Sequence, residues 1–241
     1  MTAFHLVTLR DLATISTGSK TLDTLLGGGI RSGLITDVYG ESGSGKTQLC
    51  FTAAVNCIKH IGKVLFVDTA GTFRPERIVE IGGSQDVLEK ISILRALVTG
   101  DQINAIQKIA DLDPRLVIVD TVTGLFSAEY SGPSRHLAVM KHLRNLAMTA
   151  IACRCAVIVT NMVRQVPTNA IDQAGRNIAQ AIIPAQQREY LGSSVSIYSH
   201  IKLKLEIIDA KSSRFRAKLI QPPRAAAAEF GVSARGITDL A

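Results

Sequence analysis

Short apolar runs alternate with segments of helical pattern along the chain as far as residue 160. Five runs have the length and the turn-forming boundaries of buried strands, and they cover residues 34–39, 64–68, 91–97, 116–120 and 156–160. The segments of helical pattern cover residues 16–30, 48–60, 75–81, 102–110 and 135–151. Buried strands that alternate with helices predict a mostly parallel central sheet with helices on both faces.

The pattern changes after residue 160. Residues 163–190 show weak periodicity and are rich in Gln, Asn and Ala, which predicts a long loop. Residues 195–208 and 214–220 have the pattern of two strands around a turn, so we expect antiparallel C-terminal strands at one edge of the sheet. A chain of 241 residues suits one α/β domain over residues 1–241, with residues 1–14 as an N-terminal extension.

The composition of the chain indicates where the protein works in the cell and what class of partner it could bind. No apolar run reaches the roughly 18 residues that span a bilayer, and the start of the chain lacks the apolar stretch of a secretory signal. The four cysteines have neither zinc-site nor disulfide spacing, which agrees with a cytoplasmic protein that has no membrane contact. The net charge of +7 favours a polyanionic partner only if the charge is focused on one surface.

A glycine-rich loop joins the first predicted strand to the helix at residues 48–60. It completes the phosphate-binding pattern G-x-x-x-x-G-K-[ST] with Gly40, Glu41, Ser42, Gly43, Ser44, Gly45, Lys46 and Thr47. Glycines let the backbone aim its N–H groups at phosphate oxygens, and the start of the helix favours an anion. We expect Lys46 to reach the β and γ phosphates of ATP and the Thr47 hydroxyl to ligate Mg²⁺.

Asp120 closes the buried strand at residues 116–120 and is the second candidate for the metal. A carboxylate at the end of such a strand can hold Mg²⁺ through water. Plainer interpretations are a fortuitous glycine loop and an aspartate that caps a turn. Gln48, directly after the loop, completes the predicted nucleotide-binding set from this region.

Longer stretches resemble the RecA/RadA recombinase family, particularly archaeal RadA and its shorter relative RadB. The resemblance is carried by residues 15–23 (ISTGSKTLD), 40–50 (GESGSGKTQLC), 71–77 (GTFRPER), 116–125 (LVIVDTVTGL) and 158–161 (IVTN). It implies a RecA-like P-loop NTPase core that uses ATP and Mg²⁺ and acts on single-stranded DNA in homologous recombination and DNA repair.

The resemblance also implies roles for individual residues. Arg74 and Arg77 would lie near the adenine or at a protomer boundary. Arg135 would belong to a first DNA-binding loop, and Arg164 and Arg176 to a second loop that begins at residue 163. Because RadA-type proteins form filaments with ATP between subunits, the partners would include a RadA-type recombinase or a second copy of this chain.

Four departures from the family's pattern change the expected activity. Ala70 stands where the family has the Glu that orients the attacking water, so no catalytic residue is certain and hydrolysis should be weak. Met162 stands where the family usually has a Gln that senses the γ-phosphate. Gln221 stands in place of an Asp-containing cap, and the sequence shows no helical DNA-binding domain before the core. These departures favour an accessory paralogue.

Two further basic segments are candidates for DNA contact from the residues alone. Arg135, Lys141 and Arg144 lie in one predicted helix, whose plainer interpretation is a solvated face. A second group would form a basic ridge on paired strands, or would protect an edge strand from aggregation; it comprises Lys202, Lys204, Arg214, Arg216 and Lys218. The loop from residue 163 holds no aromatic residue before Tyr190, which argues against base stacking within it.

Three hypotheses about function remain open. The first is an accessory protein that binds ATP and single-stranded DNA and hydrolyses ATP poorly. The second is a fully active DNA-dependent ATPase recombinase in which another group positions the water. The third is a KaiC-like signalling ATPase, which shares the core without needing DNA.

Overall fold

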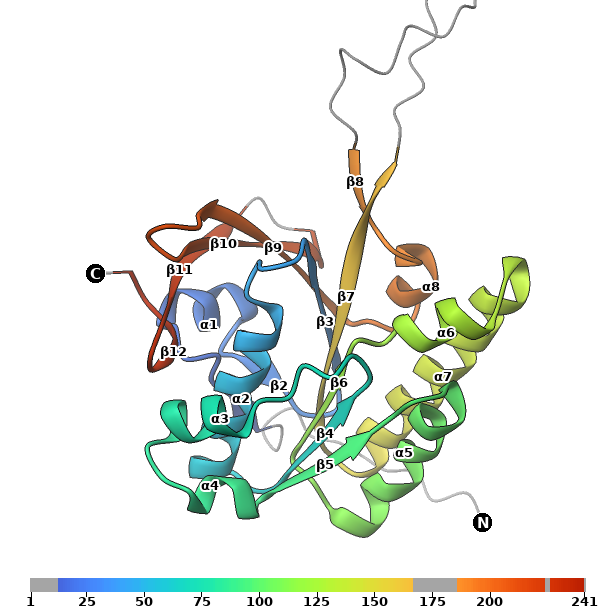
Figure 1. Cartoon of the computed structure of the whole chain (residues 1–241), viewed down its shortest axis with the longest axis horizontal. Coiled ribbons are helices and arrows are strands. Elements are labelled where there is room, and N and C mark those ends of the chain that lie inside the picture. Colours follow the sequence, from blue (N-terminus) through green and yellow to red (C-terminus); the bar gives the residue numbers. More distant parts are fainter. Residues whose placement is uncertain (1–12, 167–185, 224–225, 241) are drawn as a thin grey trace, which may run out of the picture.

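The computed structural model describes residues 13–166, 186–223 and 226–240, and its main feature is a ten-stranded sheet with helices on both sides (Figure 1). The parallel part runs, in spatial order, through β9 (Ile201–Asp209), β3 (Ile35–Gly40), β7 (Ala156–Val166), β6 (Leu116–Asp120), β4 (Val64–Asp68) and β5 (Ile91–Arg95). Beyond β9 the sheet continues antiparallel through β10 (Arg214–Gln221), β11 (Ala227–Ser233) and β12 (Gly236–Thr238). The predicted α/β fold with antiparallel C-terminal strands is therefore confirmed.

Two smaller strand pairs complete the sheets. β1 (Thr14–Ile15) pairs with β2 (Ile30–Arg31) in a separate two-stranded sheet. β8 (Gln186–Glu189) pairs antiparallel with the end of β7, and this pair projects beyond the rest of the sheet (Figure 1). We call residues 163–166 and 186–189 the stem.

The helices bury their apolar faces in two separate cores. One face of the sheet carries α1 (Lys20–Leu26), α2 (Lys46–His60), α3 (Pro75–Gly82) and α4 (Asp86–Glu89). The other face carries α5 (Thr99–Leu112), α6 (Gly124–Glu129), α7 (Gly132–Ala152) and α8 (Gly192–Ser196). No helix among the described residues is long and apolar enough to cross a membrane.

Successive side chains of a central strand point to opposite faces of the sheet, so one strand contributes to both cores. In β4, Phe66 faces the core around α2, whereas Leu65 and Val67 face the core around α5 and α7. Phe66 packs with Phe51 of α2 and with Phe73, at ring-centroid distances of 5.0 to 5.8 Å. Because both faces of β4 are buried, residues 64–67 are all apolar, as the sequence pattern indicated.

Two element predictions from the C-terminal third were wrong. The strand predicted at residues 195–208 begins only at Ile201, because residues 192–196 form α8, in which the Ser196 hydroxyl donates to the carbonyl oxygen of Gly192 at 2.6 Å. The predicted loop at residues 163–190 is not a loop at its ends, since these form the stem. Residues 167–185 lie outside the described residues.

The parallel strands bring a glycine, a methionine and two aspartates to one edge of the sheet. Gly40 at the end of β3 is level with Met162 of β7. Asp68 at the end of β4 is level with Asp120 at the end of β6. Ligands in open α/β sheets bind beyond such carboxyl ends, so this edge is where a site is expected.

Candidate functional site

A cavity of about 540 Å³ opens at this edge of the sheet. The glycine-rich loop between β3 and α2 forms one wall, and the ends of β6 and β7 form another. Its lining residues are Gly40, Ser42, Gly43, Gly45, Lys46, Thr47, Gln48, Ala70, Thr72, Asp120, Thr121, Met162, Val163, Ser213, Phe215 and Val232. Most of the residues predicted to bind nucleotide therefore surround one cavity.

The backbone of the glycine-rich loop requires its glycines. Gly43 and Gly45 have φ angles of 79° and 93°, a region that side chains disfavour. A Cβ on Gly40 would collide with the Leu205 carbonyl oxygen and would lie 2.7 Å from the Ser44 hydroxyl. The loop can therefore wrap closely around a group that binds inside it.

The loop presents donors suited to phosphate. α2 begins after Gly45, and no side-chain hydrogen bond caps it there, which suits the start of this helix to an anion. The Ser44 hydroxyl is fully buried and has no hydrogen-bond partner among the described residues. Lys46 donates to the carbonyl oxygens of Gly40 at 2.9 Å and Glu41 at 2.7 Å. Burial lowers the pKa of Lys46, an effect that the Asp120 carboxylate partly opposes.

The predicted metal ligands lie in direct contact. The Thr47 hydroxyl donates to Asp120 Oδ2 at 2.8 Å, and the Thr72 hydroxyl donates to the same oxygen at 3.0 Å. Thr160 donates to the other oxygen, Oδ1. The described residues contain no group of three or more His, Cys, Asp or Glu side chains that could hold a metal. Thr47 and Asp120 nevertheless fit Mg²⁺, which commonly takes one or two protein ligands together with phosphate oxygens and water.

Ala70 lies on the cavity wall, as its place in the sequence suggested. Asp68 holds the loop that contains Ala70, because its carboxylate accepts hydrogen bonds from the four backbone N–H groups of residues 70–73. The same carboxylate pairs with Arg95 at 2.8 Å. Burial alone would raise the pKa of Asp68, but these N–H groups and Arg95 hold it below its usual value. Among the described residues that line the cavity, Asp120 alone carries a carboxylate. The described lining of the cavity thus offers a metal ligand and no second carboxylate to activate water.

Arg74 and Arg77 lie beside the cavity and are not among the residues that line it. Arg74 donates to the carbonyl oxygens of Gly71 and Phe73. Arg77 donates from Nε to Gln48 Oε1 at 2.8 Å and also reaches the carbonyl oxygen of Ser233 at 2.5 Å. Arg77 therefore ties α3 to α2 and to the end of β11, with Gln48 between it and the cavity.

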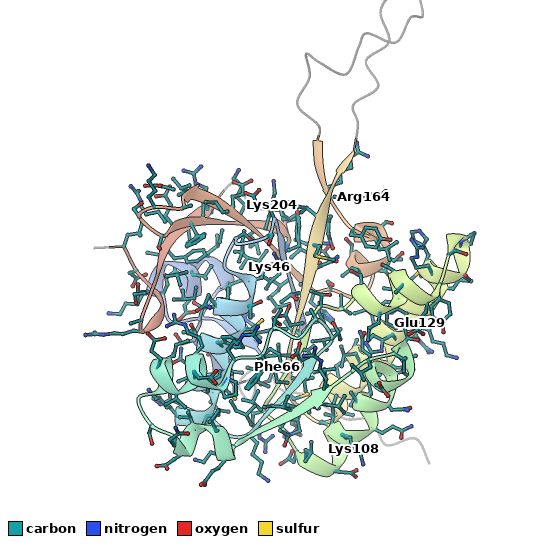
Figure 2. All side chains as sticks on the ribbon, in the orientation of Figure 1. Lys46, Phe66, Lys108, Glu129, Arg164 and Lys204 are labelled. Carbon is teal, nitrogen blue, oxygen red and sulfur yellow. The ribbon has the colours of Figure 1, made fainter. Side chains whose placement is uncertain are left out.

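Two of the three arginines predicted to bind DNA meet at one tyrosine. Arg135 of α7 donates to the Tyr190 hydroxyl at 2.7 Å, and the Arg164 guanidinium lies 5.7 Å from the centroid of the Tyr190 ring. Figure 2 shows Arg164 on the projecting part of β7, away from Lys46 in the body of the protein. Arg176 lies outside the described residues.

The predicted hairpin exists, and carboxylates offset part of its basic charge. β9 and β10 pair antiparallel, but Glu206 lies between two of the lysines and accepts from Lys204 at 2.9 Å and Lys218 at 2.8 Å. Glu229 of β11 pairs with Arg214 and Arg216 in the same way. The alternative of a protected edge strand is wrong, because β10 is paired on both sides, whereas the four cations share two carboxylates and keep a positive surplus.

A buried charged cluster, which the sequence did not suggest, lies beneath the stem. Lys202 of β9 is 3% exposed and pairs with Asp37 of β3 at 3.1 Å and with Glu189 of β8. Burial, and then the neighbouring Glu189, raises the pKa of Asp37 well above its usual value, although Lys202 opposes the shift. The other oxygen of Glu189 accepts from the Asn161 amide at 2.9 Å. Glu189 thus connects the stem to Asn161, whose neighbour in the sequence, Met162, lines the cavity.

The sequence is similar to a family model and to several known proteins. The sequence model of the family described as Rad51 matches residues 9–240. Among its relatives, a maize (Zea mays) protein described as "DNA repair protein RAD51 homolog B" is 32% identical, over 95% of this chain and 71% of its own length. A protein of Cenarchaeum symbiosum described as "DNA repair and recombination protein RadA" is 34% identical, over 95% of this chain and 60% of its own length. A protein of the same description from Ignicoccus hospitalis is 32% identical, over 95% and 74%.

Proposed function

Because the chain belongs to the Rad51 family, we propose that it binds ATP-Mg²⁺ and, under control of that nucleotide, single-stranded DNA in recombination and repair. The observation that carries the nucleotide part is the glycine-rich loop, with its buried Ser44 hydroxyl, uncapped helix start and adjoining Lys46. Bound ATP would supply the phosphoryl group and Mg²⁺ the charge that stabilises its transfer. Lys46 would bind the β and γ phosphates, and Thr47 and Asp120 would hold the metal.

The residues of the same cavity lead us to expect that this protein hydrolyses ATP slowly. A water that attacks the γ-phosphate needs a group to orient it and accept its proton, and such a group typically contributes about 10²–10⁴-fold. Ala70 can do neither, and Asp120 accepts three hydroxyl donors at the metal position. We infer an accessory role in which ATP acts mainly as a ligand that sets DNA affinity.

The proposed partners are single-stranded DNA and a recombinase subunit. Arg135 and Arg164 converge at Tyr190, at the base of the stem, and support the DNA contact. For a protein partner, β5 ends the strand order of the sheet and exposes Ile93 at 49%, and Leu97, two residues beyond the strand, is exposed at 72%. An open strand edge with exposed apolar side chains is suited to strand addition by a RadA-type recombinase or by a second copy of this chain.

The nucleotide part is tested by titrating a fluorescent ATP analogue into wild-type protein and into the variant Lys46→Ala. Loss of one charged hydrogen-bonding partner should weaken binding roughly 10- to 100-fold. Lys59→Ala, at the far end of the same helix, is the matched control and should bind like wild type. Equal binding by wild type and Lys46→Ala would contradict the proposed site.

A further inference from the structure

Gly27, the first of three consecutive glycines between α1 and β2, lines a second cavity with a volume of about 220 Å³. Leu34 and His200, which directly precede β3 and β9, are also part of its lining. The nucleotide cavity adjoins Gly40, the last residue of β3, so the two cavities lie at opposite ends of that strand. The ends of a six-residue strand are about 16 Å apart, and the two cavities share no lining residue.

Apolar side chains form most of this second cavity. They come from α1, β9, β10 and the turn before β3, and they comprise Leu25, Leu26, Leu34, Ile201 and Leu219. All but Leu34 are buried in the core around α2, which fixes the shape of the cavity. A mostly apolar cavity with a few polar groups is the common form of a small-molecule site. Sites for drug-sized ligands have roughly 300–1,000 Å³, so this smaller volume suits a smaller ligand.

Arg31 is one of two polar side chains in the lining. Its Nη2 donates to the carbonyl oxygen of Gly27 at 2.7 Å, and a Cβ on Gly27 would lie only 2.8 Å from the same nitrogen. The glycine therefore leaves room for the guanidinium. Among the described residues no carboxylate pairs with Arg31, and the contact with Gly27 engages one of its five N–H donors. The remaining donors suit a carboxylate, which a guanidinium can bind through two parallel hydrogen bonds.

His200 is the other polar side chain and supplies a further donor. Its Nδ1 accepts a hydrogen bond from the Ile35 N–H at 3.2 Å, and its own backbone N–H donates to the Ile35 carbonyl oxygen at 3.0 Å. Burial lowers the pKa of His200, so the ring is neutral at pH 7 and carries its proton on Nε2. Both polar side chains of the described lining are therefore free to donate to a ligand.

We propose that this cavity binds a small carboxylate with an apolar body, of the class of aryl-substituted or short-chain fatty acids. Arg31 and the Nε2–H of His200 bind the carboxylate, and the leucines and Ile201 surround the apolar part. A neutral ligand of the same shape leaves the guanidinium without an anion, so the charge of the ligand decides its affinity. The site does not depend on the proposed function, because it shares no residue with the nucleotide cavity or with the proposed DNA contacts.

3-Phenylpropionate is the probe, because it joins one carboxylate to an apolar ring. Titration calorimetry at pH 7 should give a Kd on the order of 1 mM, a value suited to a ligand of this size. 3-Phenylpropionamide has the same size and no charge, and it should bind at least about 10-fold more weakly. Equal affinity for the acid and the amide would overturn the inference. So would loss of probe binding when ATP-Mg²⁺ is added, because the probe would then occupy the nucleotide cavity.

A pair of arginine variants tests the carboxylate contact. Arg31→Met keeps the apolar part of the side chain and removes its donors, so probe binding should weaken at least about 10-fold. Arg115→Met is the matched control, because Arg115 directly precedes β6 at the same end of the sheet and lies outside the lining. This control should bind the probe like wild type. Folded Arg31→Met protein, as judged by its melting temperature, that binds with wild-type affinity contradicts the proposed site.

Methyl resonances locate the probe in the wild-type protein, so this measurement does not depend on the folding of a variant. The methyl signals of Ile201 and Leu219 should shift as 3-phenylpropionate is added. Those of Leu205, which is buried four residues along β9 and lies outside the lining, should change far less. Signals of Ile201 and Leu219 that stay constant up to 10-fold above the order of the expected Kd would overturn the inference.

Discussion

Restoring a carboxylate at residue 70 should convert this protein into an effective ATPase. Ala70 is exposed on the cavity wall, and its loop is held by the contacts of Asp68, so a longer side chain can extend into the cavity without displacing the core. A surface substitution of this kind should change the free energy of unfolding by less than about 0.5 kcal/mol. The variant Ala70→Glu is therefore expected to fold and to bind ATP as wild type does.

The expected gain follows from what the cavity lacks. The lining residues offer one carboxylate, Asp120, which is committed to the metal position. A general base usually contributes about 10²–10⁴-fold, which corresponds to about 3–5 kcal/mol of activation free energy. Wild type should therefore hydrolyse ATP slowly, and Ala70→Glu should raise single-turnover phosphate release by at least about 100-fold.

The assay measures phosphate release with Mg²⁺ and single-stranded DNA, alongside binding of a fluorescent ATP analogue. Ala70→Gln is the matched control, because it has the same length as Glu and cannot accept the proton at neutral pH. It should bind ATP normally and gain little activity. Rapid turnover by wild type, or no rise with Ala70→Glu, would refute the reasoning and favour a recombinase in which another group or a neighbouring subunit positions the water.

Three further predictions concern the buried charges and the metal position. Lys202→Met leaves the buried Glu189 and Asp37 without their shared cation and should cost about 3–5 kcal/mol in chemical denaturation, whereas Lys204→Met on the same strand should cost less than about 1 kcal/mol. Burial lowers the pKa of His142 to about 4, so the unfolded chain binds the extra proton between pH 6.5 and 4. The free energy of unfolding should therefore fall by about 3 kcal/mol as the pH drops through that window, and His142→Gln should remove this slope; an unchanged slope would contradict it. Thr47→Val should weaken the Mg²⁺ dependence of ATP binding in titrations with and without EDTA, and equal Mg²⁺ dependence would exclude its role.

The sequence predicted those parts of the molecule that depend on local pattern. The glycine-rich loop is recognisable because its strand, its glycines and its helix are consecutive, and Asp120 because it ends an apolar strand. The place of Ala70 on the cavity wall also followed from its position after β4. The position of a residue at the end of a strand or helix follows from that strand or helix, so the sequence alone could predict it.

The parts that failed depend on contacts between distant segments. The charge of β9 and β10 was overestimated because Glu229, which pairs with two arginines, comes from β11, which had not been predicted. The cluster of Asp37, Glu189 and Lys202 joins residues up to 165 positions apart, and no spacing in the sequence marks it. The contact between Arg164 and Tyr190 was also not predicted, because it depends on the pairing of β7 with β8.

The most direct test of the central claim is the anisotropy of labelled single-stranded DNA, titrated with this protein with and without ATP-Mg²⁺ at two salt concentrations. Binding that appears with ATP-Mg²⁺, weakens steeply at the higher salt and is lost in Lys46→Ala is the predicted result, because phosphate contacts release counterions and the nucleotide controls them. Binding that is the same without nucleotide would contradict the proposed control by ATP. No binding under any condition would contradict a DNA-binding role and favour the signalling ATPase.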